Sequence, residues 1–251
     1  MIGALLILLV LGGAWEAYAR LGNVDDFILP APSQVAQALW DDRTLLWHNL
    51  LVTAQEVALG ILVALVLGAA LAIAIHLSPA LRRSVYPLLV GSQAVPIVVV
   101  APLLIVWFGF GITPKLAIIA LVCFFPVVVT TLDALAAVDP EQRKLLRTLD
   151  ASRRQELRWV EIPAALPGAL AGAKIAVAIA VIGAVFAEYA GSSEGLGNVI
   201  LQAIPQLETA RAYAAVALLA ILAIILFALL SLAERLLVPW ARRPDPERSR
   251  A

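Results

Sequence analysis

Cysteine, histidine and charged residues are all scarce in this chain of 251 residues. The single cysteine, Cys123, lies in an apolar run, which excludes an internal disulfide and a multi-cysteine metal site. The two histidines, His48 and His76, are far apart in the sequence, which argues against a histidine metal cluster. The sequence also lacks G-x-x-x-x-G-K-[ST], the phosphate-binding loop of many ATPases. We therefore expect no metal, no cofactor, no catalytic residue and no nucleic-acid partner.

Apolar side chains are what the sequence has in excess. They make up 62% of the residues, charged side chains make up 14%, and the mean hydropathy is +0.95. Soluble domains carry roughly 45–50% apolar and about 25% charged residues. The composition therefore predicts an integral membrane protein that is embedded in a lipid bilayer.

Six segments are apolar enough to cross a bilayer, whose core of about 30 Å needs roughly 20 helical residues. They are Ile2–Ala19, Leu50–Leu77, Val85–Phe110, Pro114–Leu135, Gly168–Ala190 and Ala212–Leu236. Pro96 and Pro102 interrupt the third segment and predict a kink or a break there, because proline has no backbone N–H. The first segment has neither a basic start nor a small-residue cleavage site, so we interpret it as a retained helix. The expected fold is all-α: one polytopic membrane domain, residues 1–251, with six transmembrane helices.

Lysine and arginine predict the orientation of these segments, since basic loops stay in the cytoplasm. Six crossings put thirteen basic residues on one side of the membrane and four on the other. The four are Arg20, Arg43, Lys115 and Arg211. We therefore expect both termini, a charged loop at 136–167 and a tail at 237–251 in the cytoplasm. The segment 20–49 is then outside.

The charged loop carries helix-start signals. Asp139 followed by Pro140 is typical of an N-cap and the first helical position, and Ser152 with Gln155 has the pattern of a capping box. We predict two short helices, 140–149 and 153–160, with a turn between them. Pro163 and Pro167 are expected to end the loop before the fifth span. A solvated hairpin with scattered surface charges is the simplest alternative.

The loop resembles the cytoplasmic coupling loop of binding-protein-dependent ABC transporter permeases. The signature of that family is Glu-Ala-Ala, three residues, Gly, nine residues, then Ile-x-Leu-Pro. Its last part falls on Val160 to Pro163, its glycine on Asp150, and its Glu-Ala-Ala on Lys144 to Leu146. An aspartate would then stand where the family needs a positive φ angle, which aspartate adopts less easily than glycine.

Further segments narrow the resemblance to one group of these permeases. The segments FILPAPS (residues 27–33), GAVFAEYAG (183–191) and GLG (195–197) are similar to nitrate/sulfonate/taurine-type permeases. Within that group, residues 145–153 and 188–193 look most like permeases for thiamine precursors of the hydroxymethylpyrimidine kind.

The resemblance implies a type I ABC importer permease, which is a transport subunit and not an enzyme, in the bacterial inner membrane. Separate cytoplasmic ATPase subunits would hydrolyse ATP, an extracytoplasmic substrate-binding protein would deliver a small organic solute, and a permease homodimer would frame one path. The resemblance places the ATPase contact on the coupling loop. The residues expected in this contact are Lys144, Arg147, Asp150, Ala151, Ser152, Arg153, Arg154 and Pro163.

Polar residues inside the spans are candidates for the substrate path, because ionisable groups in lipid are costly. Glu56 and Glu188 lie near the outer ends of the second and fifth spans, and Gln93 lies beside the proline break of the third. Each could instead bond a neighbouring helix, and the carboxylates could snorkel to the interface, as we expect of Lys174.

Two other kinds of function remain open at this point. One is an ion-coupled secondary transporter that uses Glu56 and Glu188, although no internal repeat of hydrophobic segments is evident. The other is a membrane scaffold whose loop docks a partner. The solute of an importer could also be a sulfonate, taurine or nitrate.

Overall fold

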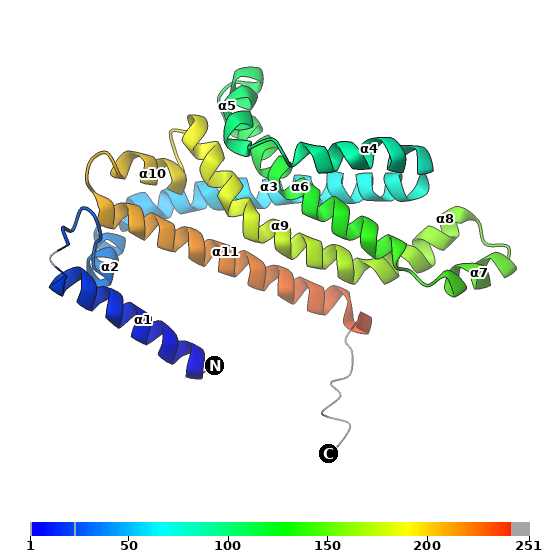
Figure 1. Ribbon diagram of the computed structural model, residues 1–251, viewed down its shortest axis with the longest axis horizontal. Helices are drawn as coiled ribbons and strands as arrows, with labels where there is room; N and C mark the ends of the chain where they lie inside the picture. The colour runs from blue at the N-terminus through cyan, green and yellow to red at the C-terminus, as the bar shows by residue number, and fades with distance from the viewer. Residues whose placement is uncertain (1, 23, 242–251) are drawn as a thin grey trace, which may run out of the picture.

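The computed structural model describes residues 2–22 and 24–241, and every regular element in that part of the chain is helical. The α-helices are α1 (Ile2–Leu21), α2 (Pro32–Asp41), α3 (Arg43–Leu77), α4 (Pro79–Ser92), α5 (Ile97–Phe108), α6 (Ile112–Ala136), α7 (Pro140–Thr148), α8 (Arg153–Glu156), α9 (Ile162–Gly191), α10 (Leu196–Ala203) and α11 (Thr209–Leu237). Figure 1 shows α3, α6, α9 and α11 along the long axis, with α7 and α8 at one end and α2 and α10 near the other. We call these ends the loop end and the α10 end. The all-α prediction is confirmed.

Four helical stretches are long and apolar enough to cross a membrane: α3, α6, α11 and the stretch Arg153–Gly191 that ends in α9. A fifth crossing is present if α4 and α5 count as one span, bent by 104° between them. The break falls at Gln93–Pro96, inside the segment where a kink was predicted, and Pro96 stands directly before α5. The first predicted span, Ile2–Ala19, forms α1, which is not counted among these stretches. Residues 242–251 of the predicted tail lie outside the described residues.

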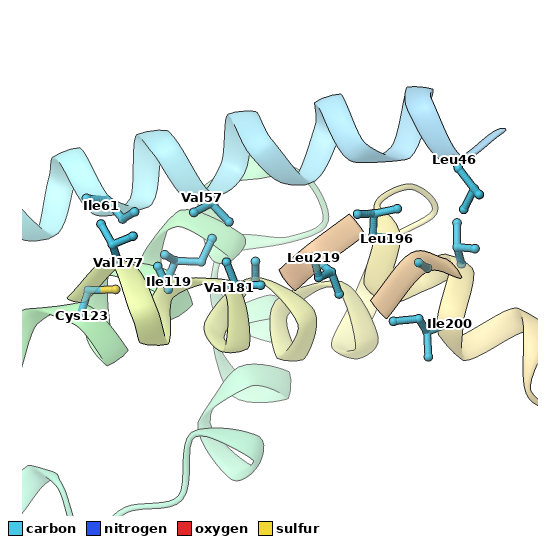
Figure 2. Close-up of a cluster of buried hydrophobic side chains, with 14 of the residues drawn as sticks. Leu46, Val57, Ile61, Ile119, Cys123, Val177, Val181, Leu196, Ile200 and Leu219 are labelled. Carbon is cyan, nitrogen blue, oxygen red and sulfur yellow. The ribbon is translucent and has the colours of Figure 1, made fainter. Parts of the chain in front are cut away.

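Helix α6 is the centre of the molecule, because it packs against α3 and against α9 more extensively than any other described pair of helices. Figure 2 shows part of the cluster of buried apolar side chains between these helices, α10 and α11; it includes Val57, Ile61, Ile119, Val177, Val181, Leu196 and Leu219. The helices approach closely where a glycine faces a branched side chain. A Cβ on Gly60 would lie 2.5 Å from Cγ2 of Ile119. Such small-to-large contacts are typical of membrane helix pairs.

Helix α1 is attached to α2 by polar contacts. Its Glu16 accepts hydrogen bonds from the backbone N–H of Ser33 at 3.0 Å and from the Ser33 hydroxyl at 2.8 Å. Arg20 donates to the same hydroxyl at 2.9 Å. Helix α2 begins at Pro32, within the FILPAPS segment. The first N–H groups of a helix have no partner within the helix, and Glu16 accepts from one of them, the N–H of Ser33. Ser33 therefore connects the start of α2 to α1.

Candidate functional site

The turn between α7 and α8 has the backbone conformation that the motif spacing predicts. Asp150 has φ +53°, which is a left-handed conformation. The N–H groups of Asp150 and Ala151 donate to the carbonyls of Arg147 at 3.1 Å and Leu146 at 3.0 Å. These two bonds close the C-terminus of α7 in the way a glycine normally does, and aspartate is one of the few other residues that tolerate this conformation. The Asp150 departure from the signature therefore preserves the turn.

The second predicted helix, 153–160, is longer than expected, and neither Pro163 nor Pro167 interrupts it. It begins at Arg153, after the backbone N–H of Ser152 donates to Gln155 Oε1 at 2.7 Å. It then passes through a π-helical turn, Leu157–Glu161, and continues as α9. A π-turn interrupts the regular hydrogen-bond ladder just before Pro163, which has no N–H to contribute. The coupling loop and the fifth span therefore form one continuous helical stretch.

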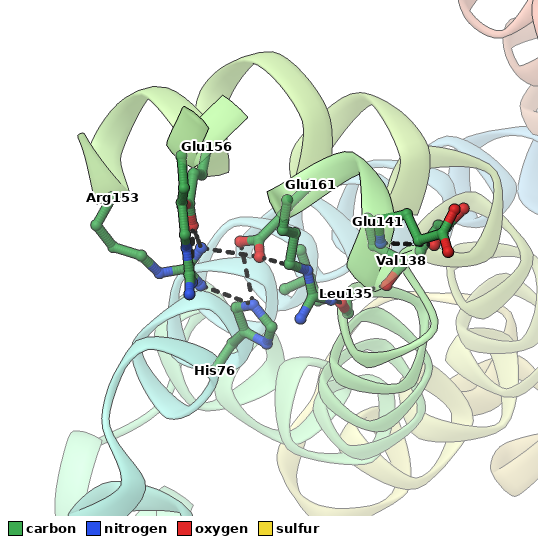
Figure 3. A network of polar contacts seen from close by, with 10 residues as sticks. His76, Leu135, Val138, Glu141, Arg153, Glu156 and Glu161 are labelled. Carbon is green, nitrogen blue, oxygen red and sulfur yellow. Dashed lines mark hydrogen bonds and ion pairs between the residues drawn. The ribbon is translucent and has the colours of Figure 1, made fainter. Parts of the chain in front are cut away.

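Glu161 lies at the centre of a buried ionic network at the loop end (Figure 3). Its side chain is fully buried. One carboxylate oxygen lies 3.1 Å from His76 Nε2, and the other lies 2.8 Å from Arg153 Nη1 and 3.1 Å from Arg143 Nε. Glu161 Oε1 and Arg143 Nε have no hydrogen-bond partner among the described residues, so both arginine contacts of this oxygen are close ion pairs without hydrogen-bond alignment. Three cationic or basic groups from three helices therefore surround one carboxylate.

Glu156 holds the two other arginine contacts of this network. Its carboxylate accepts from Arg147 Nε at 2.6 Å and from Arg153 Nη1 at 3.0 Å. The hydrogen bond to Glu156 raises the pKa of Arg147 above its ordinary value, so this arginine stays charged. Arg147 and Arg153, both predicted to contact a partner, are thus engaged within the chain itself. Lys144 and Arg154 are exposed and form no ion pair with any described residue.

Exposed apolar side chains accompany these two cations. Leu145 and Leu149 are 62% and 70% exposed, and a spacing of four residues places them on one face of α7. Trp159 on the π-turn is 72% exposed. Lipid would cover such side chains on a span, but α7 is a polar helix beyond the spans. An apolar face next to unpaired cations is typical of a protein-docking surface. We call Lys144, Leu145, Leu149 and Arg154 the docking face.

A second polar cluster lies at the α10 end and includes Glu188, which is fully buried near the end of α9. Its carboxylate accepts from Thr53 Oγ1 at 2.6 Å and from the backbone N–H of Gly197 at 2.5 Å. Thr53 in turn accepts from the N–H of Leu196 at 2.9 Å, and Asn49 Oδ1 accepts from the N–H of Gly195 at 2.6 Å. Side chains of α3 and α9 therefore cap the N-terminus of α10, where negative charge is favoured.

Glu56 lies in the same region and is paired with a lysine. It is 3% exposed, and its Oε1 accepts from Lys115 Nζ at 2.5 Å. Lys115, itself only 8% exposed, also donates to the Ser192 hydroxyl at 2.6 Å. Sequence reasoning missed the role of Lys115. The available signal was that this lone lysine begins a span at the end where two carboxylates need a cation.

The third path candidate, Gln93, lies apart from this cluster. It is exposed at the break between α4 and α5. Together with Ser92 it lines a cavity of about 740 Å³ whose other walls are apolar side chains of α5, α6 and α9, among them Val122 and Ile179. The structure thus brings Glu56 and Glu188 together and leaves Gln93 elsewhere. Their roles in a substrate path stay predictions.

Lys174 is paired with a carboxylate of a neighbouring helix. It donates to Glu234 of α11, and its ammonium group lies 5.9 Å from the ring centroid of Phe227. An opposite charge and an aromatic face together compensate a cation at the edge of a span. Lys174 therefore joins α9 to α11.

Comparison with known proteins adds to this geometry. Residues 60–243 match the family described as binding-protein-dependent transport system inner membrane component. The chain is 34% identical over 239 residues to the formylaminopyrimidine transport permease protein of Halalkalibacterium halodurans, a match that covers 95% of each chain. It is 37% identical over 238 residues to the riboflavin transport system permease protein of Chloroflexus aurantiacus, covering 94% of this chain and 88% of that one.

Two further matches are more distant. The taurine transport system permease protein of Escherichia coli is 32% identical over 247 residues, which is 95% of this chain and 88% of that one. Among solved structures, a chain of the MetNI methionine ABC transporter in an inward facing conformation has a TM-score of 0.63 at 20% identity. That match covers 80% of this chain and 98% of the other chain. At this identity the similarity shows the fold alone.

Proposed function

The chain belongs to the family of binding-protein-dependent transport system inner membrane components and is the permease subunit of an ABC importer, and we propose that its solute is a thiamine precursor of the hydroxymethylpyrimidine kind. ATP is hydrolysed by a separate subunit, and the family places the permease in the inner membrane as a multi-pass protein. The observation that carries the solute proposal is the 34% identity with a formylaminopyrimidine permease over 95% of both chains. Relatives named for riboflavin and taurine make those solutes the alternatives.

The docking face is our proposed contact for the ATPase. It combines the exposed apolar pair Leu145 and Leu149 with Lys144 and Arg154, and it lies on the loop that carries the family motif. An acidic groove on the ATPase would complement the two cations. An extracytoplasmic binding protein would dock at the α10 end. Two copies of the chain would frame the solute path, with the cavity beside Gln93 on its wall.

We propose that the loop end is cytoplasmic, from the thirteen-to-four distribution of basic residues. In a Cys123→Ala background, an impermeant thiol reagent added to intact cells should label Gln37→Cys at the α10 end and leave Glu141→Cys on α7 unlabelled. Both positions are exposed in the structure, so access depends on the side of the membrane. Permeabilised cells, in which both should react, provide the control. Labelling of position 141 alone would reverse the topology.

Transport should depend on the docking face. Arg154→Glu is expected to reduce ATP-dependent uptake of radiolabelled hydroxymethylpyrimidine by about tenfold or more, since an unpaired or repulsive charge at a desolvated interface costs several kcal/mol. Uptake is measured in cells that express the permease with its ATPase and binding protein. Arg83→Glu, which changes another exposed arginine, on α4, should transport normally.

The same assay tests the solute and the class of transporter. Excess unlabelled hydroxymethylpyrimidine should suppress uptake, while taurine and riboflavin should not. Suppression by taurine or riboflavin alone would replace the proposed solute. Uptake that needs no ATP and stops when the proton gradient is collapsed would contradict the importer itself and favour an ion-coupled mechanism. Normal uptake by Arg154→Glu would place the ATPase contact elsewhere on the loop.

A further inference from the structure

The loop that carries the docking face packs little against the spans. Among the described residues, α7 has no extensive contact with any span, and α8 contacts mainly the π-turn that follows it. The loop is instead connected to α3 and α6 by polar side chains. A displacement of the docking face can therefore reach α3 through these side chains, and it reaches α6 through the backbone at 137–139 and α9 through the continuous helical stretch as well.

Glu161 is the point at which the polar connections meet. His76 is the second-to-last residue of α3. The Nε2 atom of His76 lies 3.1 Å from Glu161 Oε2. Arg143 of α7 is 3.1 Å from Glu161 Oε1, and its Nη2 donates to the carbonyls of Leu135 at 3.0 Å and Val138 at 3.1 Å, at the end of α6. One carboxylate thus joins the loop to the ends of two central helices (Figure 3).

The burial of Glu161 makes this connection stiff. The carboxylate is fully buried, while the side chains of His76 and Arg143 are 10% and 23% exposed. Separating a fully buried carboxylate from its cations is strongly unfavourable, because water does not replace the lost partners. The loop, the end of α3 and the end of α6 should therefore move as one body.

The connection to α9 runs through the π-turn. The π-turn, Leu157–Glu161, stands between α8 and α9 and breaks the regular hydrogen-bond ladder. Such single π-turns inside α-helices are rare and are frequently found at functional sites. Because Glu161 is the last residue of this turn and directly precedes α9, its ion pairs hold the start of α9, as well as α7 and α8, against the ends of α3 and α6.

We propose that Glu161 and His76 are positioning residues of the importer, forming a joint through which displacement of the docking face is transmitted to α3. The proposal rests on the proposed function, because it presumes a partner that moves the loop. Helix α3 contains both His76 and the residues Asn49, Thr53 and Glu56 of the α10 end. The joint therefore connects an ATPase-driven movement to the polar cluster on the far side of the molecule.

In the reconstituted complex, binding of the ATPase can be measured separately from the transmission of its movement to α3. His76→Ala and Glu161→Gln should still bind the ATPase and permit ATP hydrolysis, but solute transported per ATP should fall by about tenfold. His76→Gln, which keeps both a donor and an acceptor near Glu161, should restore most of the coupling. The matched control is His48→Ala, the other histidine of α3, whose side chain is 63% exposed. Unchanged transport per ATP in an assembled His76→Ala complex would overturn the joint.

Hydrogen exchange of the isolated permease gives a second test that needs no ATPase. Glu161→Gln should increase exchange at residues 70–77 of α3, and the exposed control Glu141→Gln should not. If exchange at 70–77 is unaffected by Glu161→Gln, the joint does not exist, whatever the uptake result. If the wild-type chain neither binds an ATPase nor transports solute while the exchange result holds, the proposed function fails and the mechanical connection stands.

Discussion

Replacing Lys115 with methionine is expected to destabilise the protein by about 3–5 kcal/mol, the usual cost of removing one partner from a buried ion pair. Glu56 would lose the ammonium that lies 2.5 Å from its Oε1, and its Oε2 already has no hydrogen-bond partner among the described residues. Ser192 would lose its contact with the same ammonium group. The loss should appear as a lower unfolding temperature of the purified permease in lipid nanodiscs.

The control for this result is a second substitution at the partner. Adding Glu56→Gln to Lys115→Met removes the uncompensated charge and should recover most of the lost stability. Lys174→Met tests whether burial causes the loss. The Lys174 side chain is 22% exposed, against 10% for Lys115, so this substitution should destabilise the protein less. Equal stability of Lys115→Met and the wild type would show that Glu56 carries no charge in the folded protein.

Gly195→Ala is expected to be nearly as damaging, with a loss of about 3 kcal/mol or more, because two costs combine. Gly195 has φ +107°, which side chains rarely adopt. An added Cβ would also run into the carboxyl group of Glu188. That collision would separate Glu188 from the N-terminus of α10 and leave a buried carboxylate without its donors. The unfolding temperature and the yield of folded protein in the membrane measure the effect.

Gly91→Ala is the matched control for Gly195→Ala. Gly91 lies within α4, has ordinary helical geometry, and has no atom within 4 Å of the position of an added Cβ. Alanine there should be neutral or slightly stabilising, since it favours helix over glycine. Similar unfolding temperatures for Gly195→Ala and Gly91→Ala would mean that α10 can move away from Glu188 without cost.

Local patterns were sufficient to predict the helices and some of their irregularities. The apolar runs predicted the long helices, and Pro96 predicted the break between α4 and α5, because both depend on residues close in sequence. The resemblance to the family signature, whose glycine falls on Asp150, predicted the positive φ of that residue. The continuation of the helix through Pro163 was not predictable in this way, since the π-turn that permits it also positions Glu161 against α3, which is distant in sequence.

The candidate site was harder to predict, because charges find their partners only in the fold. Arg147 and Arg153 have the same local appearance as Lys144 and Arg154, yet the first two are bound to Glu156. Glu56 and Lys115 are 59 residues apart in the sequence, and the only signal for their pairing is that both lie at the same end of predicted spans. Helix α10 was not predicted, because its eight residues are held by side chains of α3 and α9 instead of by a strong pattern of their own.

The unbroken length of α3 restricts how sequences of this architecture can diverge. Thr53 must face α10 while His76 faces Glu161, and both positions are fixed by one helix of 35 residues. Each inserted or deleted residue between them would rotate one end by about 100° relative to the other and move it by about 1.5 Å. A single-residue change would therefore turn one of the two side chains away from its partners. Length changes in this helix should be tolerated only in steps that restore the angle, such as seven residues, and only if α6 and α9 lengthen with it.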